Sequence, residues 1–79
     1  MDPVELDCIG LRCPRPIIEI AKIAMKSPPD TVVRILSNDT AFESDIKAWC
    51  ETTKATLTEI SISKRDGVVT AIVKLNKKE

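Results

Sequence analysis

The sequence has no histidine and no tyrosine, and it has one phenylalanine, one tryptophan and three cysteines. Without histidine it cannot form a Cys–His catalytic pair, and three scattered cysteines cannot complete a tetrahedral zinc site without a carboxylate. We therefore expect no metal and no other cofactor. One Phe and one Trp also leave little aromatic surface on which nucleic-acid bases could stack.

The chain also lacks net charge, because its twelve basic residues balance its twelve acidic residues. No global field draws it to nucleic acid or to anionic lipid, so we expect neither as a direct partner. No apolar run is long enough to span a membrane, and residues 1–5 lack the basic start and apolar stretch of a signal peptide. These absences indicate a cytoplasmic protein.

Three cysteines are an odd number and too few for a secreted disulfide scaffold, so in a reducing compartment we expect free thiols. Of the 79 residues, 43% are hydrophobic and 30% are charged, which is typical of a globular protein. The length predicts one domain over residues 1–79 with a modest core.

Hydrophobic periodicity predicts six elements in the order strand, helix, strand, helix, strand, strand. The expected strands cover residues 4–8, 31–37, 55–63 and 68–75, and the expected helices cover residues 14–26 and about 42–53. The residue types of Asn38, Asp39 and Thr40 are those of helix N-caps. Asp66-Gly67 predicts a hairpin, and the out-of-phase Leu57 indicates a β-bulge.

The fold class that this order predicts is α/β. A sheet of four short strands cannot bury two faces, so we expect a two-layer β-α-β-α-β-β sandwich with both helices on one face of a mixed sheet. Phe42, Ile46, Trp49 and Cys50 share one stripe of the second helix, and we expect them to pack into the core.

The segment with the most chemistry is Gly10-Leu11-Arg12-Cys13-Pro14-Arg15-Pro16, where the first strand passes into the first helix. A proline disfavours helical angles at the residue before it, so we expect Cys13 to be the N-cap and Pro14 the first helical residue. Pro16 should fall within the first turn. The Cys13 thiol would then lie at the positive end of the helix dipole.

Cationic neighbours strengthen this expectation. Because prolines have no N–H, Arg15 and Ile17 should supply the free amides of the first turn, and Arg12 and Arg15 add positive charge beside the sulfur. Helix N-termini and cationic neighbours lower the pKa of a cysteine thiol from about 8.5, and they also stabilise a persulfide anion. No general base accompanies the thiol, so the pattern indicates a carrier rather than an independent turnover enzyme.

The three thiols have alternative interpretations. Cys13 could be a small hydrophobic residue that closes the turn, and Cys8 could either pack under the helix or act as a resolving thiol that forms a disulfide with Cys13. The second reading describes a thiol redox protein that uses Cys8 and Cys13. A third alternative is a non-catalytic regulatory or interaction domain. Cys50 shares a stripe with Ile46 and Trp49, which favours packing.

The same residues resemble the TusA/SirA-like sulfur-carrier family. The likeness covers nearly the whole chain and rests on Leu6-Asp7, on Gly10–Pro16, on Asp39 and on the run from Asp45 to Cys50. It implies a two-layer sandwich that accepts sulfane sulfur as a persulfide on Cys13. The residues that we expect to support the reactive turn are Gly10, Arg12, Pro14, Arg15 and Pro16.

The resemblance also implies partners and a pathway. Donors would be cysteine desulfurases or rhodanese-type proteins, and acceptors would include DsrE-like relay proteins. The sulfur would go to transfer RNA thiolation, molybdenum cofactor or sulfur oxidation, and we expect the carrier to be a monomer. One departure is that Thr53-Lys54 stands where the family often has Gly-His or Gly-Asn, which bears on the choice of partner.

Overall fold

The computed structural model describes residues 3–12 and 14–75 of the chain. Its elements are β1 (Val4–Asp7), α1 (Arg15–Lys26), β2 (Val32–Ser37), α2 (Phe42–Thr53), β3 (Thr56–Ile62) and β4 (Val69–Lys74). This is the order that the hydrophobic periodicity predicts, with most ends shifted by one residue. Shifts of this size are within the usual uncertainty of element ends.

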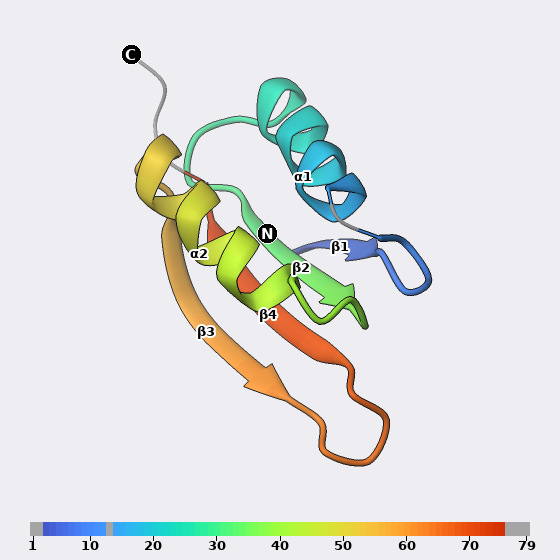
Figure 1. Cartoon of the computed structure of the whole chain (residues 1–79). Helices are drawn as coiled ribbons and strands as arrows, with labels where there is room; N and C mark the ends of the chain where they lie inside the picture. The colour runs from blue at the N-terminus through green and yellow to red at the C-terminus, as the bar shows by residue number, and fades with distance from the viewer. Residues whose placement is uncertain (1–2, 13, 76–79) are drawn as a thin grey trace.

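The strands form one four-stranded mixed sheet in the order β1-β2-β4-β3. β1 pairs with β2 in parallel, and β4 runs antiparallel to both β2 and β3. Both helical connections therefore join parallel strands and step across the sheet in the same direction. Right-handed crossovers of this kind place both helices on one face, as Figure 1 shows. The expected two-layer sandwich is confirmed.

The core lies between this face and the helices. Alternate residues of the two central strands are buried, namely Val33, Ile35 and Ser37 on β2 and Val69, Ala71 and Val73 on β4. Helix α2 contributes Phe42, Ile46 and Cys50, which are at most 5% exposed, and α1 contributes Ile20. The expected stripe of α2 is confirmed for these three residues, whereas Trp49 is only partly buried against the core.

Helix α2 begins differently from the expectation. Its N-cap is Ala41, and no side chain caps the helix, so the prediction that Asn38, Asp39 or Thr40 caps it is wrong. A backbone bond from Phe42 N–H to Asp39 O (3.1 Å) closes the turn before the helix instead. The helix ends at Lys54, whose φ of 66° is left-handed. A residue other than glycine rarely adopts this conformation.

The β3–β4 connection confirms both local predictions. The register slips between Leu57 and Glu59, which is the expected bulge, and Thr58 Oγ1 donates a hydrogen bond to Ile72 O (2.9 Å) across it. In the hairpin loop Gly67 has a φ of 73°, and its N–H donates to Ser63 O (2.8 Å). Glycine adopts a positive φ at no steric cost, which explains its place here.

Three connections leave the sheet at the same end. β1, β2 and β3 run in one direction, so their carboxyl ends meet at the edge where β4 begins, with Val69 paired to both Ser37 and Ile62. The segments 8–12, 38–41 and 63–68 therefore leave the sheet at this end, and the hairpin loop 63–68 extends beyond the other two (Figure 1). The segment that the sequence singles out is the first of these loops.

Candidate functional site

Cys13, the predicted reactive thiol, lies outside the described residues, so the site is built from the residues on either side of it. Its neighbours in the chain are Arg12, which ends the described part of the β1–α1 loop, and Pro14, which caps α1. The description below concerns the frame that these flanking residues provide.

A tight turn after β1 carries the chain toward this position. Cys8 N–H donates to Leu36 O (2.8 Å), which extends the pairing of β1 with β2, and Leu11 N–H donates to Cys8 O (3.0 Å). Gly10 is the third residue of this turn and has a φ of 88°. A type II β-turn requires a positive φ at its third position, so Gly10 has a conformational role.

The start of α1 differs by one residue from the prediction. Pro14 is the N-cap, with φ −99° and ψ 20°, and it is not the first helical residue. The first helical hydrogen bond runs from Ile18 N–H to Pro14 O (3.0 Å). Cys13 therefore precedes the cap instead of forming it. Pro16 still lies in the first turn, as expected, and its ring is buried.

The expected amide donors also change. Arg15 N–H donates to Arg12 O at 2.7 Å, so this amide is already engaged and is not a free donor of the first turn. The hydrogen bond links Arg12 directly to Arg15, three positions further along the chain. It restrains the start of α1, where Pro14 and Pro16 have no N–H to donate.

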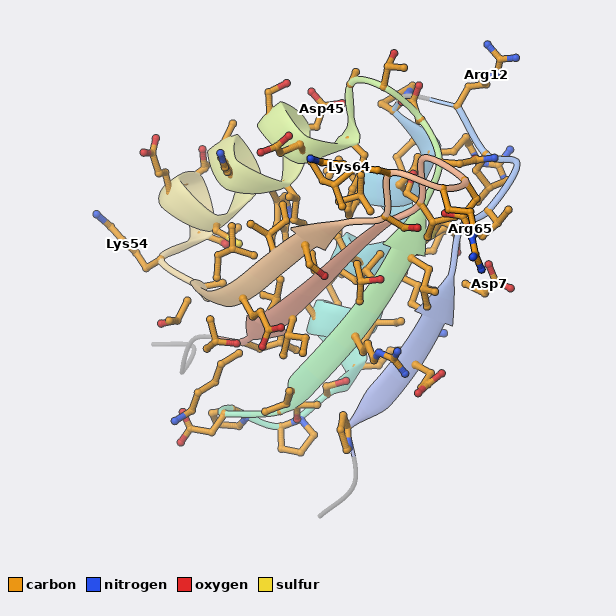
Figure 2. The ribbon with its side chains drawn as sticks, turned by 90° about the horizontal axis from the view of Figure 1, so that it is seen from below. Asp7, Arg12, Asp45, Lys54, Lys64 and Arg65 are labelled. Atoms are coloured by element: carbon orange, nitrogen blue, oxygen red, sulfur yellow. The ribbon has the colours of Figure 1, made fainter. Side chains whose placement is uncertain are left out.

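The two flanking arginines differ in their surroundings. Figure 2 shows the Arg12 side chain pointing away from the body of the protein, and none of the ion pairs found within the described ranges involves it. The Arg15 guanidinium lies 3.8 Å from the Glu19 carboxylate, which also pairs with Lys22. Exposed pairs of this kind contribute about 0–1 kcal/mol, so Arg15 is only loosely held.

The β2–α2 loop forms the other wall of the site. Asn38 Oδ1 accepts a hydrogen bond from Gly10 N–H (3.0 Å), and the buried Ser37 Oγ accepts one from Asp39 N–H (3.2 Å). Between the two loops is a hollow of about 300 Å³. Its lining residues are Gly10, Leu11, Arg12, Asn38, Asp39 and Thr40. The residue types of this loop indicated helix capping, so the hydrogen bonds that Ser37 and Asn38 accept could not be predicted from the sequence.

The other two cysteines are free thiols in apolar surroundings. Cys8 is 0% exposed and Cys50 is 5% exposed. Burial raises the pKa of both thiols, and the carboxylates of Glu19 and Asp7 raise the pKa of Cys8 further. Both groups therefore favour the neutral thiol over the nucleophilic thiolate.

Apolar side chains are exposed near the turn. Ile9 in the β1–α1 loop and Ile18 in the second turn of α1 are each 42% exposed, and Met25 is 77% exposed. Ile18 and Met25 are seven residues apart, so they lie on one face of α1.

Neither α1 nor α2 is long and apolar enough to span a membrane. The described residues contain no cluster of metal-ligating side chains.

Comparison with known proteins decides the family. The family model of the sulfurtransferase TusA matches residues 4–75, which include both loops of the site. The chain belongs to the TusA sulfurtransferase family. This confirms the resemblance to TusA-like sulfur carriers that rests on the Gly10–Pro16 segment.

The relatives agree with this assignment. A candidate sulfur carrier protein of Archaeoglobus fulgidus is 36% identical over 73 residues, which cover 92% of this chain and 94% of the relative. A candidate sulfur carrier of Neisseria meningitidis serogroup A is 33% identical over 73 residues, covering 92% of this chain and 96% of the relative. One of Aquifex aeolicus is 32% identical over 69 residues, which cover 87% of this chain but 34% of that longer protein.

The departure from the TusA family after α2 has a structural counterpart. Thr53 ends α2, and Lys54, part of the pair at which we expect a departure, adopts the left-handed conformation that follows it. Figure 2 shows the Lys54 side chain pointing outward from the protein. The departure therefore changes a cap and an exposed charge, and it lies away from the loops of the site.

Proposed function

We propose that this chain accepts sulfane sulfur as a persulfide on Cys13 and passes it to an acceptor protein. The proposal rests on the Gly10–Pro16 segment of this TusA-family chain. In this segment one cysteine is followed by two prolines where the loop leads into α1. Arg12 and Arg15 supply positive charge beside this cysteine, which favours an anionic sulfur.

The proposed loading step is a thiol transfer. The Cys13 thiolate attacks the outer sulfur of a donor persulfide, R–S–SH, and a new S–S bond forms as the donor's S–S bond breaks. The donor leaves as the thiolate R–S⁻, and Cys13 becomes Cys13–S–SH, so charge and sulfur balance without an external oxidant. Unloading is the same reaction with an acceptor thiolate as the attacking group.

A protein surface must reach Cys13 in this scheme, and the exposed apolar side chains of Ile9 and Ile18 beside the loop support contact with protein partners. We propose a cysteine desulfurase or a rhodanese-type protein as donor and a DsrE-like relay protein as acceptor. The proposed setting is cytoplasmic, and the destinations are transfer RNA thiolation, molybdenum cofactor or sulfur oxidation.

The burial of Cys8 supports a carrier over a redox protein. A resolving thiol must ionise and reach its partner, whereas Cys8 is 0% exposed and its pKa is raised by burial and by two carboxylates. Cys8 N–H is also held by Leu36 O, which fixes the backbone at the end of β1. These features are those of a packing residue.

Intact-mass spectrometry tests the proposal. The reduced protein is incubated with a cysteine desulfurase and cysteine, or with a rhodanese-type protein and thiosulfate, and peptide mapping then locates the added sulfur. We expect the gain of one sulfur atom on Cys13, no gain in Cys13→Ser, and normal gain in the matched Cys50→Ala variant. Sulfur on Cys8 or Cys50 in Cys13→Ser would contradict the assignment, and loss of two hydrogens would indicate a disulfide.

A further inference from the structure

The loop that carries Cys13 makes a long-range side-chain hydrogen bond to the β2–α2 loop. Asn38 Oδ1 accepts the hydrogen bond from Gly10 N–H at 3.0 Å, across 28 positions of sequence. In a turn closed by Leu11 N–H and Cys8 O, the N–H of the third residue has no partner within the turn. Asn38 supplies that partner from the neighbouring loop.

The backbone around Asn38 is itself restrained by a hydrogen bond. The preceding residue, Ser37, ends β2 and is 0% exposed, and its Oγ accepts a hydrogen bond from Asp39 N–H. This contact fixes the backbone on both sides of Asn38, in the manner of a serine turn. The restraint therefore runs from the core through Ser37 to Asn38 and then to the β1–α1 turn.

The other restraints on the turn act at its first residue or within it, because Cys8 N–H bonds to Leu36 O (2.8 Å) at the end of β1 and the further hydrogen bonds are local. Ile9 N–H bonds to the Asp7 carboxylate (2.9 Å), and Arg15 N–H bonds to Arg12 O. Such bonds shape the turn but do not set its distance from the β2–α2 loop. The Asn38 bond is a side-chain contact that joins the two walls of the hollow.

We infer that Asn38 is a positioning residue for sulfur transfer, which holds the Gly10–Pro16 segment against the β2–α2 loop. This inference rests on the proposed function of Cys13. Asn38 does not touch the reacting atoms in this scheme. It acts through the Gly10 amide, and it limits the range of positions that the loop, and therefore the sulfur, can adopt before a partner arrives.

Three variants of the full chain test the inference. Asn38→Ala removes the acceptor, and Asn38→Asp keeps a carboxyl oxygen in the same place. Thr52→Ala is the control, because Thr52 is exposed on α2 outside the two loops of the site and its side chain makes none of the hydrogen bonds seen among the described residues. Amide exchange of Gly10 is followed by nuclear magnetic resonance, and loading of Cys13 by glutathione persulfide is followed by peptide mass spectrometry.

In Asn38→Ala we expect Gly10 amide exchange to accelerate and Cys13 loading to slow, each roughly fivefold, the effect of one typical hydrogen bond on an equilibrium. Melting temperature should fall by a few degrees at most, because the same hydrogen bond is lost from the folded state. Asn38→Asp should restore protection of the Gly10 amide, and Thr52→Ala should match the wild type in both measurements. Unchanged exchange or loading in Asn38→Ala, an equal loss in Thr52→Ala, or no recovery of protection in Asn38→Asp would overturn the inference.

Failure of the proposed function gives a different result. If wild-type Cys13 takes up no sulfur, the carrier proposal fails in every variant alike. The pH profile of Cys13 alkylation by iodoacetamide, read in the same variants, then replaces loading as the second measurement. A midpoint that moves toward the value for the unfolded chain only in Asn38→Ala still supports Asn38 as the residue that positions the turn, and identical profiles overturn it.

Discussion

Raising the pH from neutral to about 9.5 should destabilise the folded protein through its two buried thiols. Burial raises the folded-state pKa of Cys8 and Cys50, so the unfolded chain releases these protons first. Their contribution to stability is then complete below the unfolded pKa, about 8.5, and decreases as the pH rises above it. This pH dependence of the free energy of unfolding is opposite in sign to that of a salt-bridged carboxylate, whose contribution is lost as the pH falls.

The magnitude follows from the burial of both side chains. A thiol that stays neutral in the folded state and ionises in the unfolded state lowers the free energy of unfolding by about 1.4 kcal/mol at pH 9.5. Cys8 and Cys50 are 0% and 5% exposed, so the two together give a limit of about 3 kcal/mol. This is a large part of the 5–15 kcal/mol typical of a domain.

The composition limits the other side chains that could ionise in this pH range. The chain has no histidine or tyrosine side chain that could ionise in this range together with the thiols. Urea unfolding is followed by fluorescence of the single tryptophan, Trp49, in reducing buffer. A Cys13→Ser background removes the remaining thiol and leaves the two buried ones.

Cys50→Ala in that background provides the control. It should cost on the order of 1 kcal/mol of stability at neutral pH, as a small buried truncation does. It should also reduce the alkaline decrease to about half, because one thiol remains. A free energy of unfolding that is flat from neutral pH to about pH 9.5, or an equal decrease in both proteins, would refute the reasoning.

Three further predictions concern the turn and the cap. Replacing Arg12 and Arg15 together by glutamine should shift the midpoint of the pH profile of Cys13 alkylation upward, and an unchanged midpoint would show that the arginines do not activate the thiol. Gly10→Ala should cost about 1–2 kcal/mol in urea unfolding from its positive φ alone, since an added Cβ meets nothing within 4 Å. Lys54→Gly should stabilise the protein by roughly 1 kcal/mol, because glycine adopts the left-handed φ freely, and a lower urea midpoint would contradict this.

The element order and the core could be predicted because burial imposes a period on the sequence. The alternation of Val69, Ala71 and Val73 and the helical spacing of Phe42, Ile46 and Cys50 are both reproduced in the buried faces. The family motif likewise identifies the loop that the structure places at the carboxyl ends of the parallel strands. The role of Cys13 within that loop stays a prediction.

The remaining details depend on contacts that a single sequence does not encode. The sequence predicted Cys13 as the N-cap of α1, whereas the cap is Pro14 and Arg15 N–H is engaged by Arg12 O. The contact of Asn38 with Gly10 joins residues 28 apart, and no periodicity predicts such a pair. The end of α2 at Thr53 agrees with the prediction, but the left-handed conformation of Lys54 could not be predicted, because the residue is not glycine.

The direction of the strands determines where additional protein could be attached. Val4 begins β1 beside Val33, and Leu75 follows β4 with its N–H bonded to Thr31 O (2.8 Å), so both lie at the end of the sheet where β2 starts. The two loops of the site leave from the opposite end, as does the β3–β4 hairpin. A domain, linker or affinity tag joined before Val4 or after Leu75 therefore starts from the end remote from the Gly10–Pro16 loop. This geometry suits a sulfur-carrier unit to fusion, and the Aquifex aeolicus relative, of which the aligned segment is 34%, joins such a unit to a longer chain.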